Sequence, residues 1–235
     1  MKKNAKRVFS AVIAASLTLS MGVSAYAEKH TNITVSGGGG SGSSSEYVKP
    51  DEEPFTDVDE NDWFYDDVVK VYKAKLMEGT SDTEFSPYGR LTRGMVATIL
   101  YRYAGSPSVT YRNVYDDLKD GLWYTDAVIW ATDNEVLYGY GNGLCGPEDY
   151  VTIEQLAAIV YRYVGSPEVN GNKIAEYDDV NSITPYAVDA MEWACENDML
   201  VGTMLHPTSV ALRAEAAKMF AKILDIKAAD RKSVV

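Results

Sequence analysis

The chain of 235 residues carries 34 acidic and 22 basic side chains, which gives a formal charge of −12 at pH 7. This acidic balance disfavours nucleic acid as a partner, because phosphate binding needs clustered lysine and arginine, and it disfavours nonspecific attraction to anionic lipid. An acidic protein that binds an anionic polymer must therefore do so through a few well-placed cations.

Residues 1–27 have the pattern of a secretory signal peptide. Four basic residues precede an apolar stretch from Val8 to Val23, and Ala25-Tyr26-Ala27 is a small-residue cleavage site. Cleavage removes four basic and no acidic residues and takes the formal charge from −12 to −16. A membrane-anchoring helix is the less favoured alternative, because serine and threonine interrupt the stretch. We expect an exported protein with no membrane span after signal cleavage.

Residues 28–54 are rich in glycine and serine, most densely from Ser36 to Ser45. This composition buries nothing and is typical of a flexible linker. The segment is too short for a catalytic domain.

The rest of the chain repeats with a period of 60 residues. Tyr101-Arg102-Tyr103 returns as Tyr161-Arg162-Tyr163, and Gly105-Ser106-Pro107 returns as Gly165-Ser166-Pro167. Copies one and two span 55–107 and 115–167. Copy three, with one inserted residue and a shorter loop, spans 177–224, and 225–235 remain as a tail that we expect to be frayed from Ala228 onward. One copy alone cannot bury its apolar face, so the pattern predicts a single domain built from three copies.

Each copy begins with a predicted helix. In copy one Asp62 is the expected N-cap, and Val68, Val71, Tyr72 and Leu76 recur at helical spacing. Gly79 is the expected stop of this helix, because glycine takes the left-handed conformation without a side-chain penalty. A loop with Phe85 as its buried anchor follows.

A second helix ends each copy. Thr92 is its expected N-cap in copy one, and Thr152 with Gln155 forms a predicted capping box in copy two. Gly105 and Pro107 are expected to end the first of these helices.

The sequence offers no catalytic constellation. The two histidines have no partner at a useful spacing, and the paired carboxylates of such an acidic chain are most simply a solvated surface. Residues 57–62 resemble the start of a calcium loop, but Asp62 replaces its glycine and Val68 its bidentate glutamate. We therefore predict no catalytic residue, no metal and no cofactor.

Cys145 is predicted to be a small buried residue, and a disulfide to Cys195 is permitted but not favoured.

This two-helix unit, with its Asp-Val opening, its tryptophan, its glycine and its Thr-Arg helix start, resembles the S-layer homology (SLH) motif of bacterial cell-surface proteins. Three tandem copies resemble a complete SLH trimer. The resemblance implies an all-α fold, in which three helical SLH repeats have pseudo-threefold symmetry around a central three-helix bundle and grooves lie between three lobes.

The resemblance also implies where a ligand binds. The arginine at the start of the second helix, Arg93 in copy one and Arg213 in copy three, would meet an acidic sugar of the secondary cell-wall polysaccharide, typically a pyruvate ketal. Backbone N–H groups at the helix start would help; an ordinary surface ion pair is the alternative. Copy two has Ile153 instead, so its groove is predicted to bind an anionic sugar weakly or not at all.

The remaining expected binding residues match other positions of the motif. The sequence leaves two interpretations open for the aspartates, which contact the sugar or cap a turn, and for the aromatic residues, which contact the sugar or fill the core. The expected binding residues are the acidic residues Asp57, Asp117 and Asp179, the aromatic residues Trp63, Trp123 and Tyr186, and the glycines Gly79 and Gly139. Tyr138 and Tyr140 are further stacking candidates without motif support.

Together these observations predict a secreted module at the cell wall or S-layer that binds secondary cell-wall polysaccharide non-covalently and is no enzyme. The alternative is a structural envelope protein that self-assembles or docks a partner protein. A wall-acting hydrolase is a third class, which would release reducing sugar.

Overall fold

The computed structural model describes residues 54–233, with side chains described to residue 228. The predicted signal peptide and the predicted linker up to residue 53 lie outside this part. Its elements are α1 (Tyr65–Lys73), α2 (Arg93–Tyr103), α3 (Thr125–Asp133), α4 (Ile153–Tyr163), η1 (Lys173–Glu176), η2 (Val180–Ser182), η3 (Pro185–Ala187), α5 (Val188–Glu196) and α6 (Arg213–Ser233). No strand occurs between residues 54 and 233, which confirms the all-α class.

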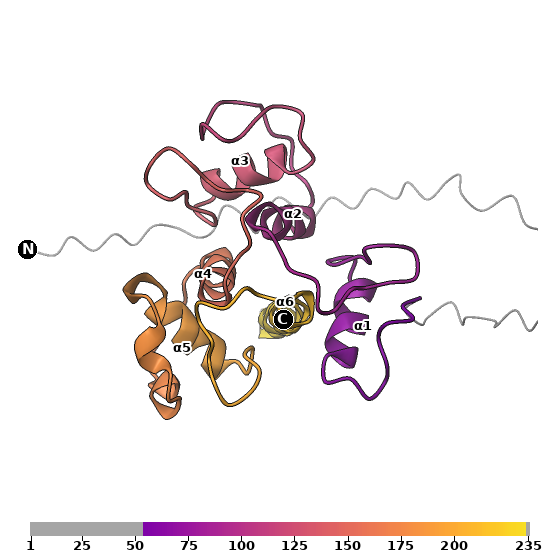
Figure 1. The fold of residues 1–235 in the computed structure, drawn as a ribbon, viewed down its shortest axis with the longest axis vertical. Helices are drawn as coiled ribbons and strands as arrows, with labels where there is room; N and C mark the ends of the chain where they lie inside the picture. The colour runs from indigo at the N-terminus through magenta and orange to yellow at the C-terminus, as the bar shows by residue number, and fades with distance from the viewer. Residues whose placement is uncertain (1–53, 234–235) are drawn as a thin grey trace, which may run out of the picture. The chain divides into compact units, whose positions relative to one another are not determined.

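The second helices of the copies, α2, α4 and α6, lie at the centre and are seen end-on in Figure 1. The first helices pack around them, but not on the second helix of their own copy. Helix α3 packs on α2, α5 on α4, and α1 on α6. Each first helix therefore packs on the second helix of the preceding copy, and the contact between α1 and α6 closes the cycle.

A ring of backbone hydrogen bonds joins the segments that enter the central helices. Val151 N donates to Leu91 O at 3.0 Å, Ala211 N to Val151 O at 2.9 Å, and Leu91 N to Ala211 O at 3.4 Å. All three residues are fully buried. The ring ties the copies together, while the expected pseudo-threefold symmetry stays a prediction.

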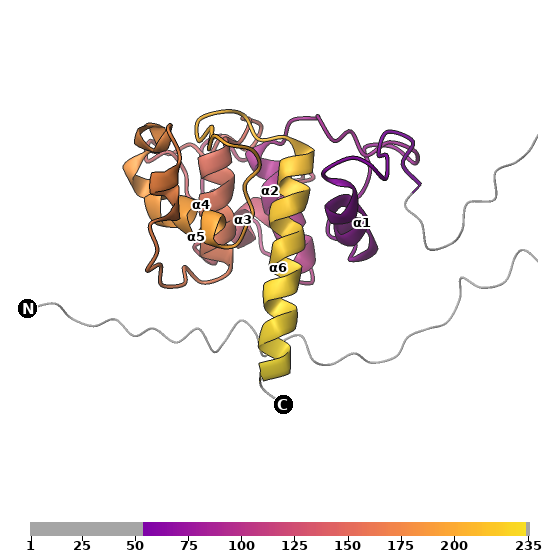
Figure 2. The ribbon, with the colours of Figure 1, turned by 90° about the horizontal axis from the view of Figure 1, so that it is seen from below.

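Helix α6 is longer than its counterparts. In Figure 2 it runs past the ends of α2 and α4. Our expectation of a frayed tail from Ala228 was wrong, because α6 continues to Ser233. Lys227 holds this extension to the bundle: its Nζ donates to the Tyr163 hydroxyl at 2.9 Å and lies over the Tyr103 ring.

The ends of α1 differ from the sequence prediction. Asp62 was wrongly expected to be the N-cap; its carboxylate accepts from Asp59 N, and α1 begins at Tyr65 with no side-chain cap. Gly79 was wrongly expected to stop the helix. The left-handed residue is Lys75, at φ 55°, directly after the C-cap Ala74.

The ends of the central helices agree with the prediction. Thr92 accepts from Met95 N, and the capping box of Thr152 and Gln155 is present. Gly105 has φ 89° just beyond the end of α2, the conformation in which glycine ends a helix.

The core is continuous and includes the predicted anchor Phe85. Cys145 takes the same place in copy two and is fully buried, as predicted. Cys145 and Cys195 are both free thiols.

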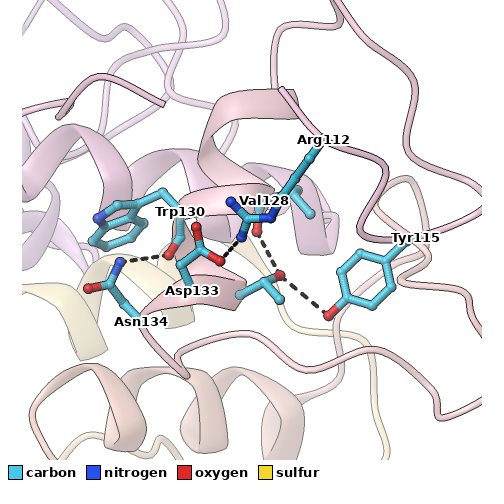
Figure 3. A network of polar contacts seen from close by, with 7 residues as sticks. Arg112, Tyr115, Val128, Trp130, Asp133 and Asn134 are labelled. Atoms are coloured by element: carbon cyan, nitrogen blue, oxygen red, sulfur yellow. Dashed lines mark hydrogen bonds and ion pairs between the residues drawn. The ribbon is translucent and has the colours of Figure 1, made fainter. Parts of the chain in front are cut away.

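A polar network fastens the start of copy two to α3, as Figure 3 shows. Arg112 forms an ion pair with Asp133. The Thr132 hydroxyl donates to Val128 O at 2.8 Å, and its oxygen forms a hydrogen bond with the Tyr115 hydroxyl at 3.3 Å. The ring of Tyr115 is therefore fixed against the first helix of its own copy.

Candidate functional site

One aspartate in each copy binds the loop between its two helices. The carboxylate accepts hydrogen bonds from two successive backbone N–H groups near the end of that loop. The donors are Phe85 and Ser86 for Asp57 (2.8 and 2.7 Å), Cys145 and Gly146 for Asp117 (2.9 and 2.7 Å), and Leu205 and His206 for Asp179 (2.9 and 2.7 Å). The structure thus places all three expected site aspartates as braces of the loops.

The brace in copy three predicts an acid dependence of stability. Burial alone would raise the pKa of Asp179, but the N–H groups of Leu205 and His206 outweigh it and hold the pKa below its ordinary value. A carboxyl with a lowered folded pKa stabilises the fold above its unfolded pKa, near 4, and this contribution is lost as the pH falls through the folded value. We expect Asp179→Asn to lower the thermal midpoint at pH 7 and to have little effect near pH 2. An equal loss at both pH values would contradict this.

The expected ligand-binding Arg93 reaches into the loop of copy two. Only 4% of its surface is exposed. Its Nε donates to Cys145 O at 2.8 Å and one Nη to Tyr138 O at 2.6 Å, and the guanidinium lies 4.7 Å from the centroid of the Tyr140 ring. Arg93 therefore fixes the loop of the following copy.

Arg213 does the same for the loop of copy one. Its Nε donates to Phe85 O at 2.8 Å and one Nη to Glu78 O at 2.7 Å, and the guanidinium lies over the Phe85 ring. Arg213 is only half-buried. Burial lowers the pKa of its guanidinium, against the opposing effect of Asp57.

The starts of the central helices have no spare N–H groups for an anion in their first two positions. Arg93 N donates to Asp149 O at 3.0 Å and Gly94 N to Pro147 O at 2.8 Å. The corresponding pairs at the starts of α4 and α6 are Ile153 N with Ser209 O, Glu154 N with Pro207 O, Arg213 N with Gly89 O, and Ala214 N with Pro87 O. The backbone N–H groups that we expected to bind the carboxylate of a ligand therefore form hydrogen bonds between copies instead.

Ile153 occupies the arginine position of copy two and faces the loop of copy three. Its side chain is 5% exposed. It lines, with Leu205, His206 and Met219, a void of about 20 Å³, which has room for no more than one water molecule.

Gly79 and Gly139 are positions of close approach. A Cβ on Gly139 would lie 2.5 Å from the Tyr115 ring and 2.6 Å from Leu144 O, and one on Gly79 would lie 2.5 Å from the Phe55 ring. Gly79 also lies in a hollow of about 480 Å³ beside Phe55 and Tyr72. Both glycines allow their loops to pack on the aromatic residue that opens the copy.

The motif aromatic residues are the most exposed of the expected site residues. The exposed fraction is 46% for Trp63, 61% for Trp123 and 52% for Tyr186. Trp63 and Trp123 each pack edge-on against the next residue, Phe64 and Tyr124 respectively. Both indole rings are therefore held by the aromatic residue that follows them and keep a large part of their surface open to solvent.

A further cluster surrounds Arg162 on α4, a residue that was not selected from the sequence, although its neighbours Tyr138 and Tyr186 were. Its guanidinium lies 4.5 Å from the centroid of the Tyr138 ring, and Nη1 donates to Val136 O at 3.4 Å. Tyr186, from copy three, interacts electrostatically with the same guanidinium. The signal that could have indicated this cluster is a substitution inside the repeat, since Tyr138 stands where copy one has Glu78.

Comparison with known proteins identifies the repeated unit. The model of a family described as "S-layer homology domain" matches residues 54–94 and 114–157. These segments are copies one and two up to the first turns of α2 and α4. Copy three lies outside both matches, yet its Asp179 binds the loop as Asp57 and Asp117 do.

The chain is also similar to parts of larger curated proteins. An endoglucanase of Bacillus sp. (strain KSM-635) is 27% identical over 177 residues, which cover 73% of this chain and 19% of that protein. The surface-layer 125 kDa protein of Lysinibacillus sphaericus is 24% identical over 165 residues, 67% of this chain and 14% of its own length. The cellulosome-anchoring protein of Acetivibrio thermocellus is 25% identical over 99 residues, 39% of this chain and 21% of that protein.

The chain thus spans about a fifth or less of these relatives. Between residues 54 and 233, no helix is long and apolar enough to cross a membrane. No group of three or more metal-ligating side chains that could hold a metal ion occurs in the described part of the chain.

Proposed function

Because the chain belongs to the S-layer homology family, we propose that it is a non-covalent anchoring module that binds secondary cell-wall polysaccharide at the bacterial surface. The module holds the chain at the cell surface and performs no chemistry of its own. The polymer carries an acidic sugar, for which a pyruvate ketal is the best candidate. The protein reaches the wall by secretion through its signal peptide.

The observation that carries this proposal is the exposure of one aromatic side chain at the same place in every copy. An exposed indole or phenol face stacks on the apolar face of a sugar ring, and its N–H or O–H reaches a hydroxyl. Trp63, Trp123 and Tyr186 offer such faces, at about half exposure, in copies whose loops are held by an aspartate and, in copies one and two, also by an arginine. Rigid placement keeps the entropic cost of binding low.

The test is binding of the mature chain to purified secondary wall polysaccharide, followed by calorimetry, with and without the acidic substituent of the polymer. We expect binding that requires the substituent. The triple variant Trp63→Ala, Trp123→Ala, Tyr186→Ala should bind at least about tenfold more weakly, because each lost ring contact is worth about 1 kcal/mol. Circular dichroism should show an unchanged fold, since none of the three side chains belongs to the buried core.

Tyr111→Ala is the matched control, because Tyr111 is an exposed aromatic residue outside the repeated position. Its affinity should equal that of the native chain. Full retention of binding by the folded triple variant would refute stacking by these residues. A native chain that binds neither form of the polymer would refute the proposed function itself.

A further inference from the structure

Arg162 is a half-buried cation without a carboxylate partner. None of the ion pairs found among residues 54–228 includes it. Its hydrogen bond to Val136 O, at 3.4 Å, is long and uses a single N–H. Burial lowers the pKa of its guanidinium. Charged side chains removed from water are normally paired, so this arrangement indicates that an anion from outside the chain is the missing partner.

The matching residue of copy one shows what has changed. Arg102, 60 residues earlier, forms an ion pair with Glu78 at 3.3 Å. Copy two has Tyr138 in place of Glu78, and the guanidinium of Arg162 lies on the Tyr138 ring instead. The replacement of Glu78 by Tyr138 removes an internal carboxylate. The guanidinium of Arg162 is held by the ring and keeps N–H groups that bind nothing within the described part of the chain. A tyrosine face holds the cation but does not neutralise it.

Two rings from different copies stand beside this guanidinium. Tyr138 is 49% exposed and Tyr186 is 52% exposed. Burial and the Glu154 carboxylate raise the pKa of Tyr186 to about 12, while Arg162 acts in the opposite direction. Tyr186 therefore lies within electrostatic reach of Arg162 and stays a neutral phenol at physiological pH.

Glu154 fixes the segment that carries Tyr186. Its carboxylate accepts from Thr184 N at 2.8 Å and from the Thr184 hydroxyl at 2.6 Å, and the Tyr186 hydroxyl lies 3.4 Å away. The side chain of Glu154 is buried, with 5% exposed. Thus Tyr186 is held by polar contacts from the same helix, α4, that carries Arg162.

We propose that Tyr138, Arg162 and Tyr186 form a binding site for a carboxylate-bearing sugar, with Arg162 as the residue that contacts the carboxylate. The inference rests on the proposed function and names a ligand-contacting cation for it. The guanidinium receives the carboxylate through two parallel hydrogen bonds. The two phenol rings cover the apolar faces of the sugar and exclude water from the ion pair.

The experiment uses the mature chain and a defined probe, the methyl glycoside of a hexose that carries a pyruvate ketal, with the ketal-free glycoside as its control. Tyr138→Glu gives Arg162 the internal partner that Arg102 has in copy one. Calorimetric affinity for the ketal glycoside should fall at least about tenfold in Tyr138→Glu and in Arg162→Gln. Arg102→Gln, the matched control, should bind as the native chain does.

The reciprocal variant Glu78→Tyr removes the partner of Arg102 and should add binding sites or strengthen binding of the ketal glycoside. Unchanged affinity in both Arg162→Gln and Tyr138→Glu, with the native chain still binding the ketal glycoside and the wall polymer, would overturn this inference and leave the proposed function intact. A native chain that binds neither glycoside nor polymer would overturn both. Equal losses for the ketal-free glycoside would also overturn it, because the effect would not depend on the carboxylate.

Discussion

Replacing Arg93 with methionine is expected to lower the free energy of unfolding by about 3 kcal/mol, because two loop carbonyls each lose a charged donor. Methionine keeps much of the apolar volume of the side chain but cannot bond to Cys145 O or Tyr138 O. The stacking of the guanidinium on the Tyr140 ring is lost as well. Urea denaturation followed by tryptophan fluorescence measures the change.

The control for this prediction is Arg102→Met. Arg102 lies on the same helix, and its ion pair with Glu78 is exposed to solvent, so the expected loss is below about 1 kcal/mol. Arg93→Lys should recover only part of the stability, because an ammonium does not reproduce the forked geometry. Equally small losses of stability in Arg93→Met and Arg102→Met would show that the hydrogen bonds of Arg93 to Cys145 O and Tyr138 O do not stabilise the loop.

Because Arg93 and Arg213 support the loops of other copies, replacing them does not test ligand binding alone. An alanine at Arg93 or Arg213 removes a support of the neighbouring loop, so weaker wall binding by such a variant would not separate direct contact from loss of loop structure. The exposed rings and Arg162 allow a cleaner test, since their substitution leaves the loop hydrogen bonds of the aspartates, Arg93 and Arg213 in place and, among the loop hydrogen bonds, removes only the long one from Arg162 to Val136 O. Arg93 and Arg213 stay candidates for sugar contact only through those donors that the loops do not use.

The sequence predicted the central helices well because their signals are local. Thr92 and Thr152 accept from the backbone three residues ahead, and Gly105 takes positive φ where α2 has ended. The first helices were predicted less accurately. Lys75 adopts φ 55° although nothing in its side chain marks it, and Gly79 is present for packing against Phe55 rather than for its dihedral angles.

The partners of the site arginines could not be predicted from the sequence, because they follow from the cyclic packing of one copy on the next. A repeat of 60 residues suggests that each helix pair packs within its own copy, whereas α1 packs on α6 and α3 on α2. Arg213 consequently meets Phe85, 128 positions earlier in the chain. The arginines bind the loop of another copy, whereas each aspartate binds the loop of its own copy, so both have a structural role in addition to any role in binding.

A second large effect is expected for Gly139→Ala, which should destabilise the domain by about 3 kcal/mol through overpacking. The new Cβ would lie 2.5 Å from the Tyr115 ring and 2.6 Å from Leu144 O. Neither the Tyr115 ring nor Leu144 O can move away freely, because hydrogen bonds hold both in place. The Tyr115 hydroxyl accepts from Gly139 N at 3.1 Å and forms a hydrogen bond with the Thr132 hydroxyl, and Leu144 O accepts from Tyr140 N at 2.8 Å. Denaturant unfolding measures the change.

Gly202 provides the matched control, because it occupies the same position in copy three with φ 91° and no atom within 4 Å of its would-be Cβ. Gly202→Ala should cost only the backbone strain of about 1–2 kcal/mol. A double-mutant cycle with Tyr115→Leu identifies the cause, because removing the ring edge should recover part of the loss in Gly139→Ala. Strictly additive effects of Gly139→Ala and Tyr115→Leu would show that the ring is not what excludes a side chain, and the close approach of loop to aromatic residue would then have to be rejected as the reason for glycine at this position.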